Sequence, residues 1–110
     1  MLDKIAKIKE DSLDWCDYTL LCDSHIKKLP YNEDETIYDR IFDMESTKEL
    51  TIDNIGMKER RLQFTSILSY KGLENKHIIL LVSNRTELDR FELYVGMTRA
   101  IYDLKILILE

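Results

Sequence analysis

Ser69-Tyr70-Lys71-Gly72-Leu73-Glu74 is a polar stretch between two apolar runs, Leu62–Leu68 and Ile78–Val82. Runs of this length predict β-strands, and the second, which is apolar at every position, is typical of a strand covered on both faces. We therefore expect a loop in which Gly72 permits close backbone approach or a positive φ, and which places the carboxylate of Glu74 at the end of a sheet. In open α/β sheets, ligands bind outside the carboxyl ends of the strands, so this loop is the first candidate for a binding site.

A second stretch, Tyr94-Val95-Gly96-Met97-Thr98-Arg99-Ala100, lies late in a pattern that predicts a helix from Thr86 to about Ile101. Thr86 can cap the start of this helix, and the helix dipole stabilises the acidic residues Glu87 and Asp89 in its first turn. A final strand is predicted over Leu104–Leu109. Strands that alternate with helices in this way predict an α/β fold with a mostly parallel sheet flanked by helices. The apolar face of the predicted helix carries Leu88, Phe91, Val95, Leu93 and Met97.

The first half of the chain is less regular. Three adjacent carboxylates at positions 33–35 form an acidic turn, which we interpret as solvated and not as a metal site. The remaining predicted elements are a helix over Met1–Glu10, strands over Trp15–Cys22, Thr36–Phe42 and Thr47–Asp53, and a short helix over His25–Leu29.

Composition limits the classes of protein that the chain can represent. Its 110 residues suffice for one small domain, and 45% hydrophobic content allows a modest core. The net charge of −5 is not the basic footprint of a nucleic-acid-binding domain, so any contact with DNA must be local. Two cysteines, Cys16 and Cys22, are too few for a disulfide scaffold and are expected to be free thiols. The start of the chain is not a signal peptide and no apolar run reaches eighteen residues, so we expect a cytoplasmic protein without a membrane partner.

Two stretches carry a resemblance to a known family. Lys71-Gly72-Leu73-Glu74 before an apolar strand, and Leu93 to Ala100 late in the helix that follows that strand, resemble motifs V and VI of the UvrD/Rep-type superfamily 1 DNA helicases. The resemblance covers about Leu62 to Leu109. It implies that residues 1–110 are a single, partial domain, namely the carboxyl-terminal part of the RecA-like second domain of such a helicase, a P-loop NTPase fold. Motif V would lie near 66–74 and motif VI near 93–100.

The resemblance also implies roles for individual residues. Arg99 matches the arginine that contacts the γ-phosphate of ATP, and a guanidinium is well suited to charge on a transferring phosphoryl group. Glu74 matches the glutamate that bonds the ribose, with Gly72 beside it. Ser66 and Lys71 match positions near single-stranded DNA. The alternatives for these residues are an Arg99–Asp103 ion pair, a solvated Glu74 in an ordinary turn, and a solvated Lys71.

The chain departs from the family pattern in ways that affect function. Leu68 stands where the family has a histidine that contacts DNA, and Glu92 occupies an apolar position. No Gly-x-x-x-x-Gly-Lys-Ser/Thr stretch and no Walker B acid pair occur, so the phosphate loop and the Mg²⁺ ligands are expected on the amino-terminal helicase domain of the same polypeptide. The isolated chain is therefore expected not to hydrolyse ATP. Two other readings are a degenerate stand-alone module without catalysis, which acts in protein interaction or regulation, and a plain α/β nucleotide-binding domain.

Overall fold

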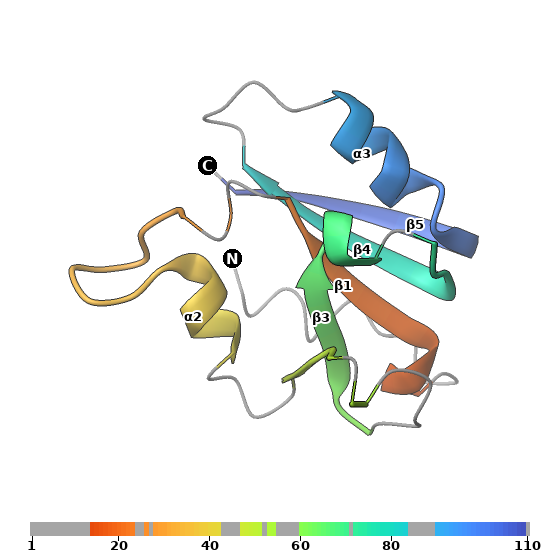
Figure 1. Ribbon diagram of the computed structural model, residues 1–110, viewed down its shortest axis with the longest axis horizontal. Helices are drawn as coiled ribbons and strands as arrows, with labels where there is room; N and C mark the ends of the chain where they lie inside the picture. Colours follow the sequence, from red (N-terminus) through yellow and green to blue (C-terminus); the bar gives the residue numbers. More distant parts are fainter. Residues whose placement is uncertain are drawn as a thin grey trace.

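Five strands form a single sheet in the computed structural model, which describes residues 14–23, 26, 28–42, 47–51, 53, 54, 60–70, 72–83 and 90–109. The strand order is β2-β3-β1-β4-β5, and every neighbouring pair is parallel (Figure 1). The predicted parallel sheet is thus confirmed. The strands are β1 (Tyr18–Cys22), β2 (Thr47–Glu49), β3 (Leu62–Ser66), β4 (Asn75–Ser83) and β5 (Ala100–Leu109).

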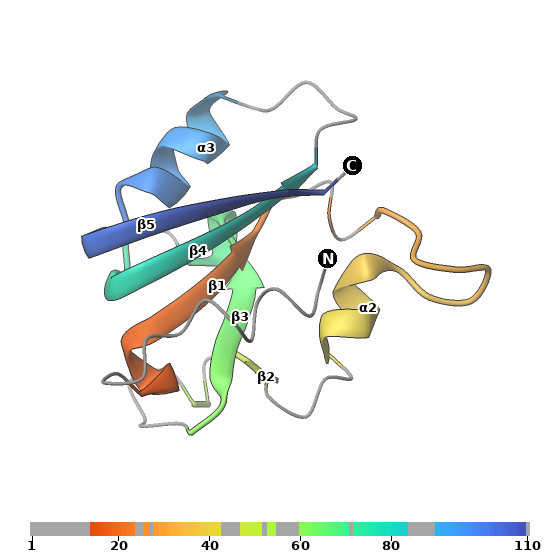
Figure 2. The same cartoon turned by 180° about the vertical axis from the view of Figure 1, so that it is seen from behind.

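In the described part of the chain, two α-helices lie on opposite faces of the sheet, as the two views in Figures 1 and 2 show. Helix α2 (Ile37–Phe42) lies between β1 and β2 in the chain, and α3 (Arg90–Met97) lies between β4 and β5. From the centre of the sheet these two connections run in opposite directions, and right-handed crossovers then place their helices on opposite faces. Two short 3₁₀ helices, η1 (Trp15–Asp17) and η2 (Leu68–Tyr70), precede β1 and follow β3.

Alternation along the central strands divides the core into two clusters. Successive side chains of a strand point to opposite faces. In β1, Leu20 belongs to the cluster that contains Ile37 and Ile41 of α2, whereas Leu21 belongs to the cluster that contains Val95 of α3. Strand β4 divides in the same way, and its residues 78–82 are almost fully buried, which confirms the prediction of a strand covered on both faces.

Helix α2 occupies a segment for which we predicted a strand. The prediction was wrong because residues at the start of the segment cap a helix. The backbone N–H of Asp39 donates to Oγ1 of Thr36 at 3.1 Å, and the backbone N–H of Thr36 donates to Oδ2 of Asp39 at 3.1 Å. This reciprocal pair satisfies two donors that a helix otherwise leaves free at its first turn.

Helix α3 ends at Met97, four residues earlier than predicted. The N–H of Thr98 donates to the carbonyl of Tyr94 at 3.1 Å, and β5 begins at Ala100, which pairs with Asn75. Met97, expected on the buried face, is 44% exposed, because it follows buried Val95 by two residues, a rotation of roughly 200° around a helix. Tyr94, in the last turn of α3, is 66% exposed.

Other predicted boundaries shift by a few residues. β1 begins at Tyr18 after η1, β3 ends at Ser66, and β5 is longer at its start than the predicted strand. Around Ile26 and Lys28 the described residues form turns and not the predicted short helix. The predicted helix over Met1–Glu10, the start of the helix predicted from Thr86, and Lys71 lie outside the described residues. No helix in the described part of the chain has the length and apolarity that a membrane crossing requires.

Candidate functional site

The two motif stretches meet where strands β4 and β5 begin; we call this end of the sheet, at the amino ends of its strands, the amino edge. Glu74 directly precedes β4 and Arg99 directly precedes β5, and these strands are neighbours whose first residues, Asn75 and Ala100, pair. The prediction that the loop containing Gly72 lies outside the carboxyl ends of the strands is therefore wrong. Because β3 and β4 are parallel, the chain that leaves the carboxyl end of β3 must return to the amino end of β4 before it can enter that strand.

Arg99 is anchored by three hydrogen bonds within the fold. Its Nε donates to the carbonyl of Val95 at 3.2 Å, and Nη2 donates to Oγ1 of Thr98 at 3.1 Å. The third bond, from Nη1 to the carbonyl of Leu73 at 3.4 Å, connects the end of α3 with the loop before β4. A guanidinium has five N–H groups, so one N–H remains on each terminal nitrogen. Asp103, the alternative partner of Arg99, has its carboxylate 3.1 Å from Nζ of Lys105 instead.

Tyr70 lies within the electrostatic reach of both charged candidates. Burial raises the pKa of its phenol above the ordinary value, the hydrogen bond with Thr19 lowers it, the negative charge of Glu74 raises it, and the positive charge of Arg99 lowers it. Its hydroxyl lies 3.4 Å from Oγ1 of Thr19, on the central strand. The carboxylate of Glu74 is exposed, and Arg99 is half-buried. Tyr70 is therefore a buried residue whose phenol senses the charges of both Glu74 and Arg99.

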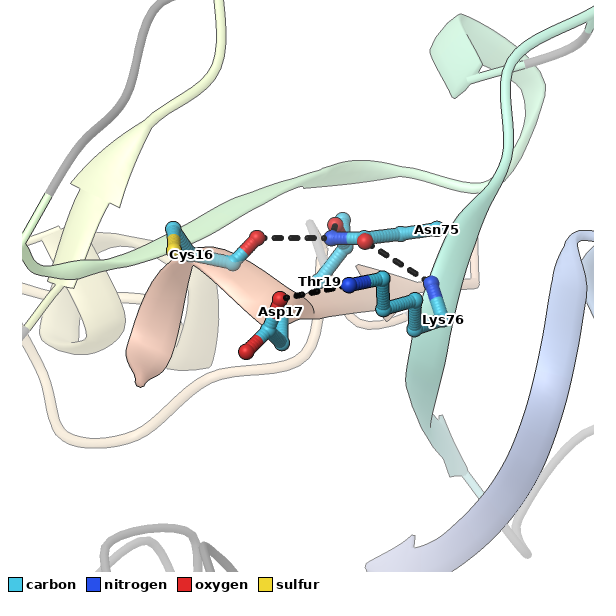
Figure 3. A network of polar contacts seen from close by, with 5 residues as sticks. All are labelled: Cys16, Asp17, Thr19, Asn75 and Lys76. Atoms are coloured by element: carbon cyan, nitrogen blue, oxygen red, sulfur yellow. Dashed lines mark hydrogen bonds and ion pairs between the residues drawn. The ribbon is translucent and has the colours of Figure 1, made fainter. Parts of the chain in front are cut away.

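A polar network under this edge joins the amino ends of β1 and β4 (Figure 3). Nδ2 of Asn75 donates to the carbonyl of Cys16 at 3.1 Å and to Oγ1 of Thr19 at 3.0 Å. Beside it, Nζ of Lys76 lies 3.6 Å from a carboxylate oxygen of Asp17. Neither Asn75 nor Thr19 was predicted from the sequence, because 56 residues separate them and no local pattern indicates their contact.

Gly72 adopts a φ of +89°, a conformation that residues with a Cβ resist. A Cβ built at Gly72 would meet no atom within 4 Å. Of the two roles expected for this glycine, the positive φ is confirmed. Apart from its two chain neighbours, no residue fills the space where this Cβ would lie.

Ser66 lies away from this site, at the carboxyl end of β3. It is 8% exposed. Its hydroxyl donates to Oγ of Ser69 at 2.7 Å and accepts from the backbone N–H of Ser69 at 3.2 Å. The structure thus brings Gly72, Glu74 and Arg99 together at the amino ends of the strands and places Ser66 at the carboxyl end of β3.

Comparison with protein-family models, curated proteins and solved structures finds no match to the chain. The described residues contain no group of three His, Cys, Asp or Glu side chains that could hold a metal ion. The candidate site contains one anchored guanidinium, one exposed carboxylate and an open glycine. A guanidinium with one N–H on each terminal nitrogen can bind two oxygens of a phosphate, and the carboxylate can accept from hydroxyl groups.

Proposed function

We propose that the chain is the carboxyl-terminal domain, RecA-like in fold, of an ATP-dependent DNA helicase of the UvrD/Rep type. Its amino edge would supply Arg99 and Glu74 to an ATP site that another domain of the same polypeptide completes with a phosphate loop and Mg²⁺ ligands. The observation that carries this proposal is the hydrogen bond from Nη1 of Arg99 to the carbonyl of Leu73, which joins the two motif stretches across 26 residues of chain.

The residues at this edge fit a nucleoside triphosphate. Arg99 is held in one orientation by three hydrogen bonds and keeps two N–H groups for phosphate oxygens. Glu74 is exposed and can accept hydrogen bonds from the ribose hydroxyls, and Gly72 leaves space beside it. ATP supplies a γ-phosphoryl group on which negative charge develops during transfer to water. Because Arg99 is already oriented, little reorganisation is needed for it to balance that charge.

In the complete protein, closure of the two domains around ATP would drive stepping along single-stranded DNA in the cytoplasm. Ser66 and Lys71 are the proposed DNA contacts. Ser66 is buried and its hydroxyl is bonded to Ser69, so it could contact DNA only after that bond opens. The isolated chain has no phosphate loop in its sequence and is expected not to hydrolyse ATP.

The test is Arg99→Ala in the complete native protein. We expect nucleotide binding to persist while ATP hydrolysis falls by about 10³-fold or more, the range known for arginine fingers. The matched control is Arg60→Ala, because Arg60 is an exposed arginine outside both motif stretches. Hydrolysis by Arg99→Ala at the rate of this control would overturn the proposal.

A second candidate is a degenerate stand-alone module that acts in protein interaction or regulation without catalysis. Two observations favour it: three N–H groups of Arg99 are bonded inside the fold, and Leu68, at the position of the family histidine, is 49% exposed. An immunoblot of source cells against this chain separates the candidates. A band near 13.1 kDa supports the module, and a band several times larger supports the helicase domain.

A further inference from the structure

Strand β5 forms one edge of the sheet, and no described segment pairs with its outer side (Figures 1 and 2). Such an edge presents a row of backbone N–H and C=O groups that can pair with another strand, and proteins usually protect it with charges, proline or a bulge. β5 has no proline, and its bulge lies near its start, where it holds one more residue than β4 between the Asn75 and His77 pairings. Further along, Ile106 and Ile108 are 43% and 51% exposed.

The two charged residues of β5 are self-complementary. Asp103 and Lys105 lie two positions apart, so their side chains lie on the same face of the strand. Each is 39% exposed, and within the chain their charged groups are 3.1 Å apart. The other neighbour of Asp103 is Nδ1 of His77, at 3.7 Å. If two copies of β5 pair in antiparallel order about Leu104, Asp103 of each copy lies directly opposite Lys105 of the other.

We propose that a second copy of this chain docks on β5 in this register, so that the two sheets continue across a two-fold axis at Leu104. In an antiparallel pair, residues directly opposite each other share a face of the sheet and interact. This register makes two pairs of opposite charge and sets Leu104 against its counterpart. Next to the bulge, Tyr102 of each copy lies opposite Ile106 of the other.

The neighbouring registers are unfavourable because of the same two charges. With the axis at Asp103, the aspartates of the two copies lie opposite each other. With the axis at Lys105, the two lysines do. An axis at Ile106 sets Lys105 opposite the apolar Leu107 and gives neither charged residue a partner of opposite charge. Like charges directly opposite each other destabilise a strand pair. The charge pattern of β5 therefore selects the axis at Leu104.

The test is the mass of the purified protein in solution, measured by sedimentation equilibrium for four variants. We expect the wild type to dimerise. Asp103→Lys and Lys105→Asp should each weaken the dimer by about tenfold or more, because each change turns both pairs of opposite charge into pairs of like charge. The double variant, Asp103→Lys with Lys105→Asp, restores the opposite pairs and serves as the folding control. It should dimerise as the wild type does.

An equimolar mixture of the two single variants should form mixed dimers, because one chain then presents two lysines and the other two aspartates. A monomeric wild type would overturn the proposal. A dimer whose affinity is the same in all variants would overturn it as well, because the contact would then lie on another surface or be made by another segment. Neither result bears on the ATP site, because Arg99 and Glu74 are unchanged in every variant.

Discussion

Gly96 sets how closely helix α3 lies on the sheet. A Cβ added at Gly96 would lie 2.8 Å from Cδ2 of Leu80 and 3.3 Å from Cδ1 of Ile67. Both of these side chains are fully buried, so neither can turn its end into solvent to make room. Replacement of Gly96 by alanine must therefore shift the helix outward or repack the cluster beneath it. Since Arg99 lies two residues beyond the end of the helix and Nε of Arg99 donates to the carbonyl of Val95 within it, such a shift would also displace its guanidinium.

Two effects of opposite sign determine the change in the free energy of unfolding. Alanine favours helical backbone over glycine by about 1 kcal/mol in a helix interior, and less here because Gly96 is the next-to-last residue of α3. Added atoms in a packed core cost about 1–3 kcal/mol. The packing effect is larger, so we expect a net loss of about 1 kcal/mol. With an unfolding entropy of roughly 2.1 cal/mol/K per residue, this loss lowers the Tm of a chain of 110 residues by roughly 4 °C.

The assay is urea unfolding followed by the fluorescence of Trp15, the only tryptophan. Met97→Ala is the matched control, since Met97 is the next residue in the helix and is 44% exposed. Its effect should stay within about 0.5 kcal/mol. If Gly96→Ala were as stable as the wild type or more stable, helix propensity would outweigh the contact with Leu80, contrary to this expectation.

Three further changes have defined outcomes. Arg99→Ala should lower the free energy of unfolding by about 1–2 kcal/mol in urea, because three hydrogen bonds of a half-buried guanidinium are lost, and Arg99→Lys, which lacks the planar fork, should recover less than half of this. Gly72→Ala should cost about 1–2 kcal/mol in the same assay because of its φ of +89°, and a cost near zero would contradict the left-handed conformation. Burial, together with a 2.8 Å hydrogen bond to Glu49, raises the pKa of Tyr38, so its phenol stays protonated in the folded chain while it ionises above a pH of about 10 in the unfolded chain. Stability should therefore fall as pH rises above about 10, and urea unfolding at neutral and alkaline pH should show a smaller fall in Tyr38→Phe.

Much of the fold could be predicted because burial leaves a pattern in the sequence. Residues 78–82 are apolar without interruption, and they form a central strand buried on both faces. The error over Thr36–Phe42 has a local cause. The segment is short and alternates loosely, and the hydrogen bonds between Thr36 and Asp39 decide in favour of a helix. The end of α3 was also misplaced, since Ala100 and Ile101 are apolar in either conformation and only their pairing beside β4 makes them a strand.

The proximity of Arg99 to the loop before β4 could be predicted from the sequence, but the end of the sheet at which they meet could not. The order of the two motif stretches indicated that Arg99 and the loop before β4 lie together, and the hydrogen bond to Leu73 places them so. Which end of the sheet they occupy depends on where β4 and β5 begin. An apolar run in the sequence does not specify the first residue of a strand to within a residue or two. The network that links Asn75 and Tyr70 through Thr19 depends on contacts across more than 50 residues, which no local pattern encodes.

The most direct test of the proposed function is ATP hydrolysis stimulated by single-stranded DNA, measured on the native protein isolated through an epitope on this chain. We would compare the wild type with Arg99→Lys, and with Arg60→Lys as the control for a change of the same kind at an exposed position. The predicted result is hydrolysis in the wild type and the control, with a loss of about 10³-fold or more in Arg99→Lys. Equal hydrolysis by all three proteins, or none by the wild type, would contradict the assignment of Arg99 to an ATP site.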